Sequence, residues 1–311
     1  MTQIYYAGSA DAWEGYRVAL PEALAELDVD ATLNNTCEDP AAVDYIVYSP
    51  SGPVKDFTPF TNTRAVLSLW AGVEKIVGNA SLTQPLCRMV DPGLSEGMTE
   101  WVTGHVLRYH LGTDVHVTMQ DGVWRDSLVP PLARDRTVGI LGLGVLGTAA
   151  AEALAALNFQ VMGWSRTAKT LPGIACHAGD DGLETVLGAS EILVLLLPQT
   201  PATTGLMNDA RFAQMRPGAM LLNPGRGPLI EDEALLRALE AGQVGHATLD
   251  VFATEPLPQD HPYWAHPAVT VTPHIASVTR TRSSARAIAR NIARGVAGQP
   301  FEDLVDRKLG Y

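Results

Sequence analysis

The sequence predicts an α/β protein in which a doubly wound parallel sheet is inserted into a smaller α/β unit. In the second half of the chain, short apolar runs such as residues 192–197 (Ile-Leu-Val-Leu-Leu-Leu) alternate with segments of high helix propensity. Such runs are typical of strands that a parallel sheet buries on both faces. One strand, residues 138–141, leads directly into a glycine-rich turn and an Ala- and Leu-rich helix at 148–157. Together these features favour a sheet of the Rossmann type.

The first part of the chain, residues 1–98, is predicted to form the smaller unit, of a flavodoxin-like α/β type. Strands are expected at residues 3–7, 44–48 and 64–69, with a helix around residues 21–27. The sequence Asp-Pro-Gly at residues 91–93 indicates a turn. A small α/β unit of its own is therefore expected to precede the larger one.

Residues 99–277 are predicted to form the larger unit. A helical pattern begins at Ser95 and carries an apolar face that includes Met98, Val102 and Val106. After the glycine-rich turn, the strands are expected at residues 160–164, 191–197, 219–223, 247–250 and 269–272. Helices are expected between them at residues 182–187, 209–215 and 232–241. The remaining residues, 278–311, are predicted to return to the smaller unit through a helix at 279–298.

Composition limits the class of protein and its partners. The 311 residues are 46% hydrophobic and 18% charged, which indicates a soluble globular protein with a large core. A net charge of −12 argues against broad binding to nucleic acid or to anionic membranes. The three cysteines lack metal-ligand spacing and indicate reduced thiols, so no metal site is expected. With no N-terminal apolar segment behind a basic one, the chain is expected to be cytoplasmic.

The glycine-rich turn predicts a dinucleotide site. A G-x-G-x-x-G pattern between a strand and a helix is more specific than the pattern alone. Gly142 permits the tight turn, Gly144 lets the backbone approach a diphosphate, and Gly147 lets the helix pack on the strand. The N-terminus of the helix, with Val145 and Leu146, would then face the diphosphate.

The strand at residues 160–164 ends in a segment that predicts which dinucleotide is bound. Its residues are Trp164, Ser165, Arg166 and Thr167. An acidic residue usually accepts the ribose 2′-hydroxyl of NAD at this position, and a carboxylate would repel a 2′-phosphate. A hydroxyl and a guanidinium, with Lys169 nearby, favour NADPH over NADH, although NADH remains possible.

Three further loops follow strands and carry reactive side chains. Residues 223–227 (Asn-Pro-Gly-Arg-Gly) hold Arg226 on a restricted turn, where its guanidinium can bind a carboxylate in a bidentate manner. Residues 250–256 contain Asp250 and Glu255, and residues 272–277 contain His274. A histidine after a strand, paired with a preceding acid, is the arrangement that a proton donor needs.

These loops and the glycine turn, in this order, resemble the D-2-hydroxyacid dehydrogenase family along essentially the whole chain. Within the family the sequence is most similar to the glyoxylate/hydroxypyruvate reductase A branch, through Trp-Ser-Arg at 164–166 and Thr-Pro-His-Ile-Ala-Ser at 272–277. The resemblance implies that Arg226 binds the substrate carboxylate and that His274 is the acid/base, paired with Glu255. It also implies that Asp250 holds the nicotinamide carboxamide region.

The resemblance implies further contacts and a homodimer. The substrate-binding set is Arg226 with Trp70, Ala71, Gly72 and Ser277, the amides of Ala71 and Gly72 holding the carboxylate. The remaining residues lining the cofactor are Leu197, Pro198, Thr204, Pro224, Gly225 and His274. The family usually has a small residue and an aspartate at positions 70 and 74, where this chain has Trp70 and Glu74. The helix from Ser95 to Tyr109 is a candidate dimer element, with core packing the alternative.

The functional hypothesis is an NADPH-preferring reductase of small 2-oxo acids of the glyoxylate and hydroxypyruvate type. Hydride transfer to C2 would form a D-2-hydroxy acid while His274 supplies the proton. One alternative is a dehydrogenase for a bulkier 2-oxo acid, which Trp70, Tyr48 and Trp101 would help to accommodate. A second is a non-catalytic NAD(P)-sensing protein, which would not need Arg226, Glu255 and His274 together. A methyltransferase is disfavoured because its cofactor carries no diphosphate.

Overall fold

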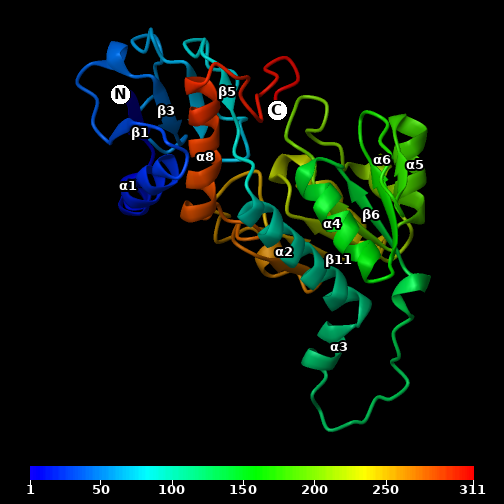
Figure 1. Ribbon diagram of the computed structural model, residues 1–311. Coiled ribbons are helices and arrows are strands. Elements are labelled where there is room, and N and C mark those ends of the chain that lie inside the picture. The colour runs from blue at the N-terminus through cyan, green and yellow to red at the C-terminus, as the bar shows by residue number, and fades with distance from the viewer. The chain divides into compact units, whose positions relative to one another are not determined.

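The computed structural model describes residues 1–311, which form two compact units (Figure 1). Unit 1 comprises Met1–Leu94 and Thr279–Tyr311, and unit 2 comprises Ser95–Val278. The division falls within helix α2, Pro92–His110. Each unit contains its own parallel sheet, so the predicted α/β fold class is confirmed. None of the helices has the length and apolar character that crossing a membrane would require.

The sheet of unit 1 has five parallel strands in the order β2-β1-β3-β4-β5. The strands are β1 Thr2–Ala7, β2 Ala31–Asn34, β3 Tyr45–Tyr48, β4 Ala65–Ser68 and β5 Leu86–Cys87. This is the flavodoxin-like strand order, in which the chain changes direction across the sheet between β1 and β3. Loops at the carboxyl ends of such strands are the usual place for ligand-binding groups.

Helices α1 (Ala10–Ala25) and α8 (Thr281–Val296) pack together on the sheet of unit 1 (Figure 1). Ile288 and Ile292 of α8 are fully buried in a cluster that also contains Leu20 of α1. The Tyr16 hydroxyl and the Ser284 hydroxyl form a buried hydrogen bond of 2.6 Å between the two helices. The last helix of the chain therefore completes the core of the unit that the first residues begin.

Two helices, α1 and α2, begin earlier than the sequence predicts. The helix expected around residues 21–27 starts at Ala10 and contains Pro21, because buried residues on one face outweigh the hydrogen bond that proline cannot donate. The turn expected at residues 91–93 is instead the start of α2. The Asp91 carboxylate accepts a hydrogen bond from the Leu94 N–H, and Pro92 occupies the first helical position, where a missing N–H is harmless.

The sheet of unit 2 has seven parallel strands in the order β12-β11-β10-β9-β6-β7-β8. The strands are β6 Thr137–Leu141, β7 Gln160–Trp164, β8 Ala175–His177, β9 Ile192–Leu195, β10 Ala219–Asn223, β11 Val244–Leu249 and β12 Val269–Val271. The helices are α3 Thr113–Thr118, α4 Val145–Ala156, α5 Gly179–Ala189, α6 Asp209–Gln214 and α7 Asp232–Glu240. The strand order reverses between β6 and β9, which is where doubly wound sheets bind nucleotides.

Three strands of the structure were not predicted: β2, β5 and β8. They contain only four, two and three residues. β2 and β5 are the edge strands of the first sheet and β8 is an edge strand of the second. Short edge strands lack the long apolar run that identifies a strand buried on both faces, so their sequences carry little signal.

Helix α2 is attached to β11 and β12 of unit 2 by polar side chains. The Tyr109 hydroxyl lies 2.6 Å from the Thr248 hydroxyl and 2.9 Å from Nδ1 of His246. Arg108 donates to the Thr270 hydroxyl at 2.8 Å. Burial lowers the pKa of His246 to about 4, so its imidazole is neutral at pH 7. These contacts fix the far end of α2 on the sheet, and α3 follows it (Figure 1).

Candidate functional site

The glycine turn of unit 2 has the geometry that each of its three glycines was expected to provide. Gly142 has a φ of +107°, and a Cβ there would lie 2.4 Å from the Leu196 carbonyl oxygen. A Cβ on Gly147 would lie 1.8 Å from the Gly142 carbonyl oxygen, so helix α4 packs directly on the turn. A Cβ on Gly144 would meet nothing within 4 Å. Open space therefore lies beside Gly144.

The first turn of α4 presents backbone donors at this open space. Gly144 is the N-cap of α4, and no side chain caps the helix. The N–H groups of Leu143 to Gly147 donate to no carbonyl of the chain, while the Thr148 N–H makes the first bond of the helix, to the Gly144 carbonyl. Unpaired N–H groups at the positive end of a helix dipole form a site suited to a phosphate.

The segment after β7 lies against the glycine turn. The Ser165 hydroxyl is buried and donates to the Thr167 carbonyl at 2.8 Å, and the Trp164 indole N–H donates to the Gly179 carbonyl at 2.8 Å. Lys169 donates from Nζ to the Leu143 carbonyl within the glycine turn. Arg166 is exposed. Two cationic side chains thus stand on the short loop that faces the turn.

The loop after β9 borders the glycine turn on its other side. The Leu196 N–H donates to the Leu141 carbonyl at 2.7 Å, and Leu197 is buried. The Thr203 hydroxyl donates to the Pro198 carbonyl at 2.7 Å, and the Thr204 hydroxyl donates to the Thr200 carbonyl at 2.9 Å. Leu196 and Leu197 therefore lie next to the turn, and the rest of the loop, with Pro198 and Thr204, is held by hydrogen bonds of its own threonines.

Arg226 stands on a turn that Asn223 organises. The buried Asn223 side chain accepts a hydrogen bond from the Gly225 N–H at 3.1 Å and donates to the Arg226 carbonyl at 3.0 Å. Nη1 of Arg226 donates to the Gly225 carbonyl at 2.7 Å. Pro224 is buried in the turn. Asn223 was not predicted as a site residue, although the Asn-x-x-Arg-Gly pattern contains it.

The Asp250 carboxylate holds the loop that carries His274. Asp250 is fully buried. Its carboxylate accepts from the Thr272 hydroxyl at 2.6 Å and from the N–H groups of Ile275 and Ala276, both at 2.9 Å. Its own carbonyl accepts from the His274 N–H at 2.8 Å. These partners are all within the chain, and the contact with nicotinamide that the resemblance implies stays a prediction.

His274 has a left-handed backbone and an acidic partner. Its φ is +56°, a conformation that a residue with a Cβ adopts only when its surroundings enforce it. Nδ1 lies 2.8 Å from Oε2 of Glu255, and Oε1 of Glu255 accepts from the Phe252 N–H at 3.0 Å. The His274 side chain is 50% exposed. With Nδ1 turned to the carboxylate, Nε2 is the nitrogen left to exchange a proton with a ligand.

The loops of Arg226 and His274 meet at one end of the sheet. They follow β10 and β12, the two neighbours of β11, and all three strands are parallel. A Cβ on Gly227 would lie 2.0 Å from the carbonyl carbon of Phe252, so the Arg226 turn packs against the loop of Glu255. Because Glu255 contacts His274, the structure brings the loops that carry Arg226, Glu255 and His274 together at the carboxyl ends of the strands.

Unit 1 presents two backbone donors in the loop after β4. The Trp70 carbonyl accepts from the Ser68 hydroxyl at 3.0 Å and from the Met89 N–H at 3.1 Å. The N–H groups of Ala71 and Gly72 donate to nothing in the unit. Two adjacent free N–H groups on a fixed loop are suited to a carboxylate.

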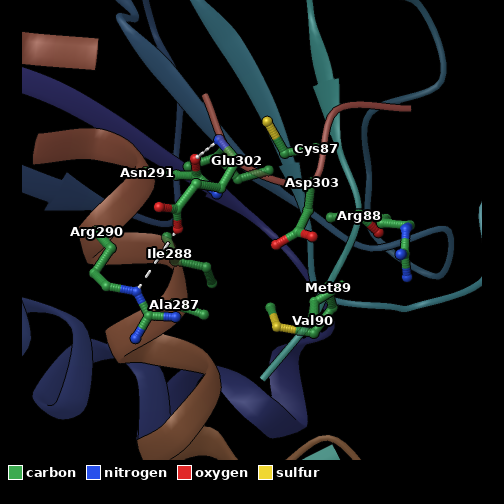
Figure 2. Close-up of a pocket in the computed structure, with 12 residues that line it drawn as sticks. Cys87, Arg88, Met89, Val90, Ala287, Ile288, Arg290, Asn291, Glu302 and Asp303 are labelled. Carbon is green, nitrogen blue, oxygen red and sulfur yellow. Dashed lines mark hydrogen bonds and ion pairs between the residues drawn. The ribbon is translucent and has the colours of Figure 1, made fainter. Parts of the chain in front are cut away.

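A cavity of unit 1 lies beneath this loop, but it contains none of the predicted site residues. Its wall includes Ser68 and Met89, the two residues that hold the Trp70 carbonyl. Figure 2 shows the cavity between α8 and the strand ends, with the Asp303 carboxylate pointing into it and Arg88 directed away. Burial raises the pKa of Asp303. The cavity is therefore separate from the predicted ligand-binding groups.

Ser277, the last predicted site residue of unit 2, lies beside the N-terminal part of α2. A Cβ on Gly97 would lie 3.3 Å from the Ser277 hydroxyl oxygen. Ala276, the residue before it, is buried with Met98 of α2. The loop that contains His274 is therefore held by Asp250 on one side and by α2 on the other.

Comparison with known proteins gives a consistent family. The profile described as "D-isomer specific 2-hydroxyacid dehydrogenase, NAD binding domain" matches residues 108–276. A glyoxylate/hydroxypyruvate reductase A of Serratia proteamaculans (strain 568) is 42% identical over 256 residues, which cover 80% of this chain and 82% of the relative.

Two solved structures resemble the whole chain. A D-isomer specific 2-hydroxyacid dehydrogenase from Xanthobacter autotrophicus Py2, in complex with NADPH and MES, has a TM-score of 0.92 and 38% identity over 100% of this chain and 99% of its own. An NADPH-dependent glyoxylate/hydroxypyruvate reductase from Sinorhizobium meliloti, in complex with NADP and sulfate, has a TM-score of 0.89 and 32% identity over 100% of both chains.

The glycine turn yields a matched pair of variants. Gly147→Ala places a methyl group against the Gly142 carbonyl, so we expect it to destabilise unit 2 by about 1–3 kcal/mol. Gly144→Ala adds its methyl group to open space at an ordinary φ of −71°, so its stability should stay within about 1 kcal/mol of the parent. Urea unfolding without ligand measures both effects. Gly144→Ala should nevertheless bind NADPH more weakly in a calorimetric titration; unchanged affinity would contradict the assignment of this space to a ligand.

Proposed function

The chain belongs to the D-isomer specific 2-hydroxyacid dehydrogenase family, and we propose that it reduces small 2-oxo acids of the glyoxylate and hydroxypyruvate type with NADPH. As a member of this family it is an NAD(P)-dependent oxidoreductase. The observation that carries the proposal is the pair formed by His274 and Glu255 at 2.8 Å, on loops that also pack against the turn of Arg226. A protein that only senses the dinucleotide has no use for this proton-donating arrangement.

The residues of unit 2 fit a pyridine dinucleotide. The open space beside Gly144 and the unpaired N–H groups of Leu143 to Gly147 suit its diphosphate. The reduced nicotinamide supplies a hydride to C2 of the 2-oxo acid. For this chain we assign the positions that line the dinucleotide to the loops after β6, β7, β9 and β10, and unit 2 as a whole to the coenzyme domain.

Arg226 and His274 have separate tasks in the proposed mechanism. Arg226 binds the carboxylate and stabilises the negative charge that develops on the C2 oxygen. His274, protonated on both nitrogens, donates its Nε2 proton to that oxygen and becomes neutral. The Glu255 carboxylate accepts from Nδ1–H and keeps the ring oriented. The product is a 2-hydroxy acid, formed from one hydride and one proton.

Unit 1 is assigned to substrate recognition. The free N–H groups of Ala71 and Gly72 are suited to the substrate carboxylate, and their loop is fixed through the Trp70 carbonyl. The Thr279 hydroxyl also donates to the Leu69 carbonyl at 3.1 Å. Backbone donors held in this way need no reorganisation when an anion arrives.

The preference for NADPH is assigned to the loop after β7. Ser165 lacks the negative charge that would repel a 2′-phosphate, and Arg166 and Lys169 add two positive charges. Lys169 is already held over the glycine turn by the Leu143 carbonyl, so its ammonium stands close to the proposed cofactor site. The two relatives of known structure described above are bound to NADPH or NADP, which supports this choice.

The proposed activity is tested with His274→Ala. We expect the parent to oxidise NADPH in the presence of glyoxylate or hydroxypyruvate and the variant to lose about 10²–10⁴ in kcat, because the proposed proton donor is removed. NADPH affinity, measured by fluorescence titration, should be retained and shows that the variant is folded. A variant within a few-fold of the parent would exclude His274 as the acid. A parent that binds NADPH tightly and reduces none of a panel of 2-oxo acids would favour the sensing alternative.

The cofactor preference is tested with Ser165→Asp. A carboxylate at this position repels the 2′-phosphate and accepts a hydrogen bond from a free 2′-hydroxyl, so kcat/KM should move from NADPH toward NADH. The expected change in the ratio is roughly 10- to 100-fold, the range for a hydrogen bond to a charged group. Arg166→Gln serves as a second variant that leaves the buried position untouched and should weaken NADPH alone. If both variants preserve the ratio of the parent, the assignment of this loop is wrong.

We propose that the chain forms a homodimer through the arm at residues 111–132. In Figure 1, α3 and the loop after it run clear of the seven-stranded sheet. Of the 22 large apolar side chains that are strongly exposed, nine lie in this arm, among them Val123, Trp124 and Val129. Such a concentration is typical of a protein interface. The predicted dimer element, α2, leads directly into the arm.

The dimer is tested by size-exclusion chromatography with light scattering. We expect the parent to elute with twice the mass of the chain and the double variant Val123→Asp/Val129→Asp to elute as a monomer, since buried unpaired charges strongly oppose association. Val18→Asp, at an exposed valine of α1, is the matched control and should leave the mass unchanged. A monomeric parent, or an arm variant that stays dimeric, would show that the arm is not the interface.

A further inference from the structure

The loop after β4 carries an exposed aromatic side chain directly beside its two free N–H groups. Trp70 is 40% exposed although its backbone is held by the Ser68 hydroxyl, which accepts from the Trp70 N–H at 3.1 Å and donates to its carbonyl at 3.0 Å. The Met89 N–H also donates to that carbonyl. The backbone that carries the indole is therefore fixed next to Ala71 and Gly72.

A positive charge accompanies this indole. Nζ of Lys75 lies 5.8 Å from the centre of the Trp70 ring, within the range of a cation–π contact. Lys75 is exposed, so its ammonium can exchange water for a ligand without a large loss of hydration. Val73 and Ile76, on either side of it in the chain, are buried and fix its backbone. The ring in turn limits the positions that the long side chain can take.

We infer that Trp70 and Lys75 form a subsite for a second, distal carboxylate, and that the chain prefers 2-oxo dicarboxylates to 2-oxo monocarboxylates of equal length. The inference rests on the proposed function, because it places the first carboxylate on the Ala71 and Gly72 N–H groups. The carbon chain of the substrate then lies along the indole, and its far carboxylate meets the Lys75 ammonium. The reaction is the same one: with NADPH bound, C2 would receive a hydride and its oxygen one proton, which would give a 2-hydroxy dicarboxylate and NADP⁺.

The Lys75 ammonium beside the Trp70 ring favours this class over a bulky apolar substrate. An apolar tail would cover the indole but would also press against the ammonium and reduce its hydration. A carboxylate gains a charge-assisted interaction at the same place. In a chain with a net charge of −12, a cation at this position also offsets the repulsion that a doubly charged anion meets as it approaches.

The inference is tested by kinetics with length-matched acids. The pairs are oxaloacetate with 2-oxobutyrate and 2-oxoglutarate with 2-oxovalerate, assayed with NADPH. In the parent we expect the higher kcat/KM for the dicarboxylate of each pair, and a loss of that advantage as ionic strength rises. Lys75→Met should lower the kcat/KM for the dicarboxylates by about fivefold, the scale of an exposed ion pair, and leave the monocarboxylates unchanged. Lys75→Arg should keep most of the preference.

The controls separate this inference from a structural effect and from failure of the proposed function. Lys308→Met removes an exposed lysine elsewhere in unit 1 and should change neither pair. Trp70→Leu removes the ring that positions the ammonium and should weaken the dicarboxylate preference. A parent without that preference, or a Lys75→Met variant that slows both members of a pair equally, overturns the inference. If glyoxylate and all four acids fail with NADPH, the proposed function itself has failed.

Discussion

The buried carboxylate of Asp250 is the group on which the arrangement of the site depends most. A charge without exposure to water is tolerated only when hydrogen bonds replace its hydration, and Asp250 receives three, from Thr272, Ile275 and Ala276. The same bonds fix the residues on both sides of His274, whose left-handed backbone would otherwise relax. The His274 N–H donates to the carbonyl oxygens of Asp250 and Thr272. Asp250 thus fixes the backbone that carries His274, and Glu255 holds its imidazole ring.

Close approach of backbones, made possible by missing side chains, assembles the rest of unit 2. Gly227 lets the turn of Arg226 touch the backbone of Phe252, and Gly147 lets α4 rest on the Gly142 carbonyl. A Cβ on Gly225 would lie 2.8 Å from the Leu195 carbonyl oxygen, so this turn is also pressed against the neighbouring strand. In a parallel sheet the carboxyl ends of all strands lie at the same end of the sheet. Loops that are far apart in sequence therefore come into direct backbone contact there. Backbone contact fixes their functional side chains more firmly than side-chain packing alone.

The sequence identifies the parts of this molecule that depend on local chemistry. The strand-turn-helix at residues 138–157 and the apolar strand at 192–195 have strong patterns, and both are present in the structure. The edge strand β8 and the start of α1 have weak sequence patterns, because these elements are stabilised by contacts with residues far away in the sequence. The family resemblance implied the pairing of His274 with Glu255, and the structure shows their contact. The spacing of the motifs could not indicate that the Asp250 carboxylate accepts a hydrogen bond from Thr272. That hydrogen bond depends on β11 and β12 lying side by side in the sheet.

The net charge of the chain is a poor guide to the charge of the ligands that it is proposed to bind. A protein with a net charge of −12 is expected to repel anions, yet both ligands of the proposed reaction are anionic. Much of the attraction for these anions comes from groups that a count of charged residues does not include. The free N–H groups at Leu143 to Gly147 and at Ala71 and Gly72 belong to the backbone, which every residue except proline possesses. Fixed dipoles attract an anion over short distances without adding a positive field at long range. A net negative charge of the whole chain is therefore compatible with local sites for a phosphate and a carboxylate.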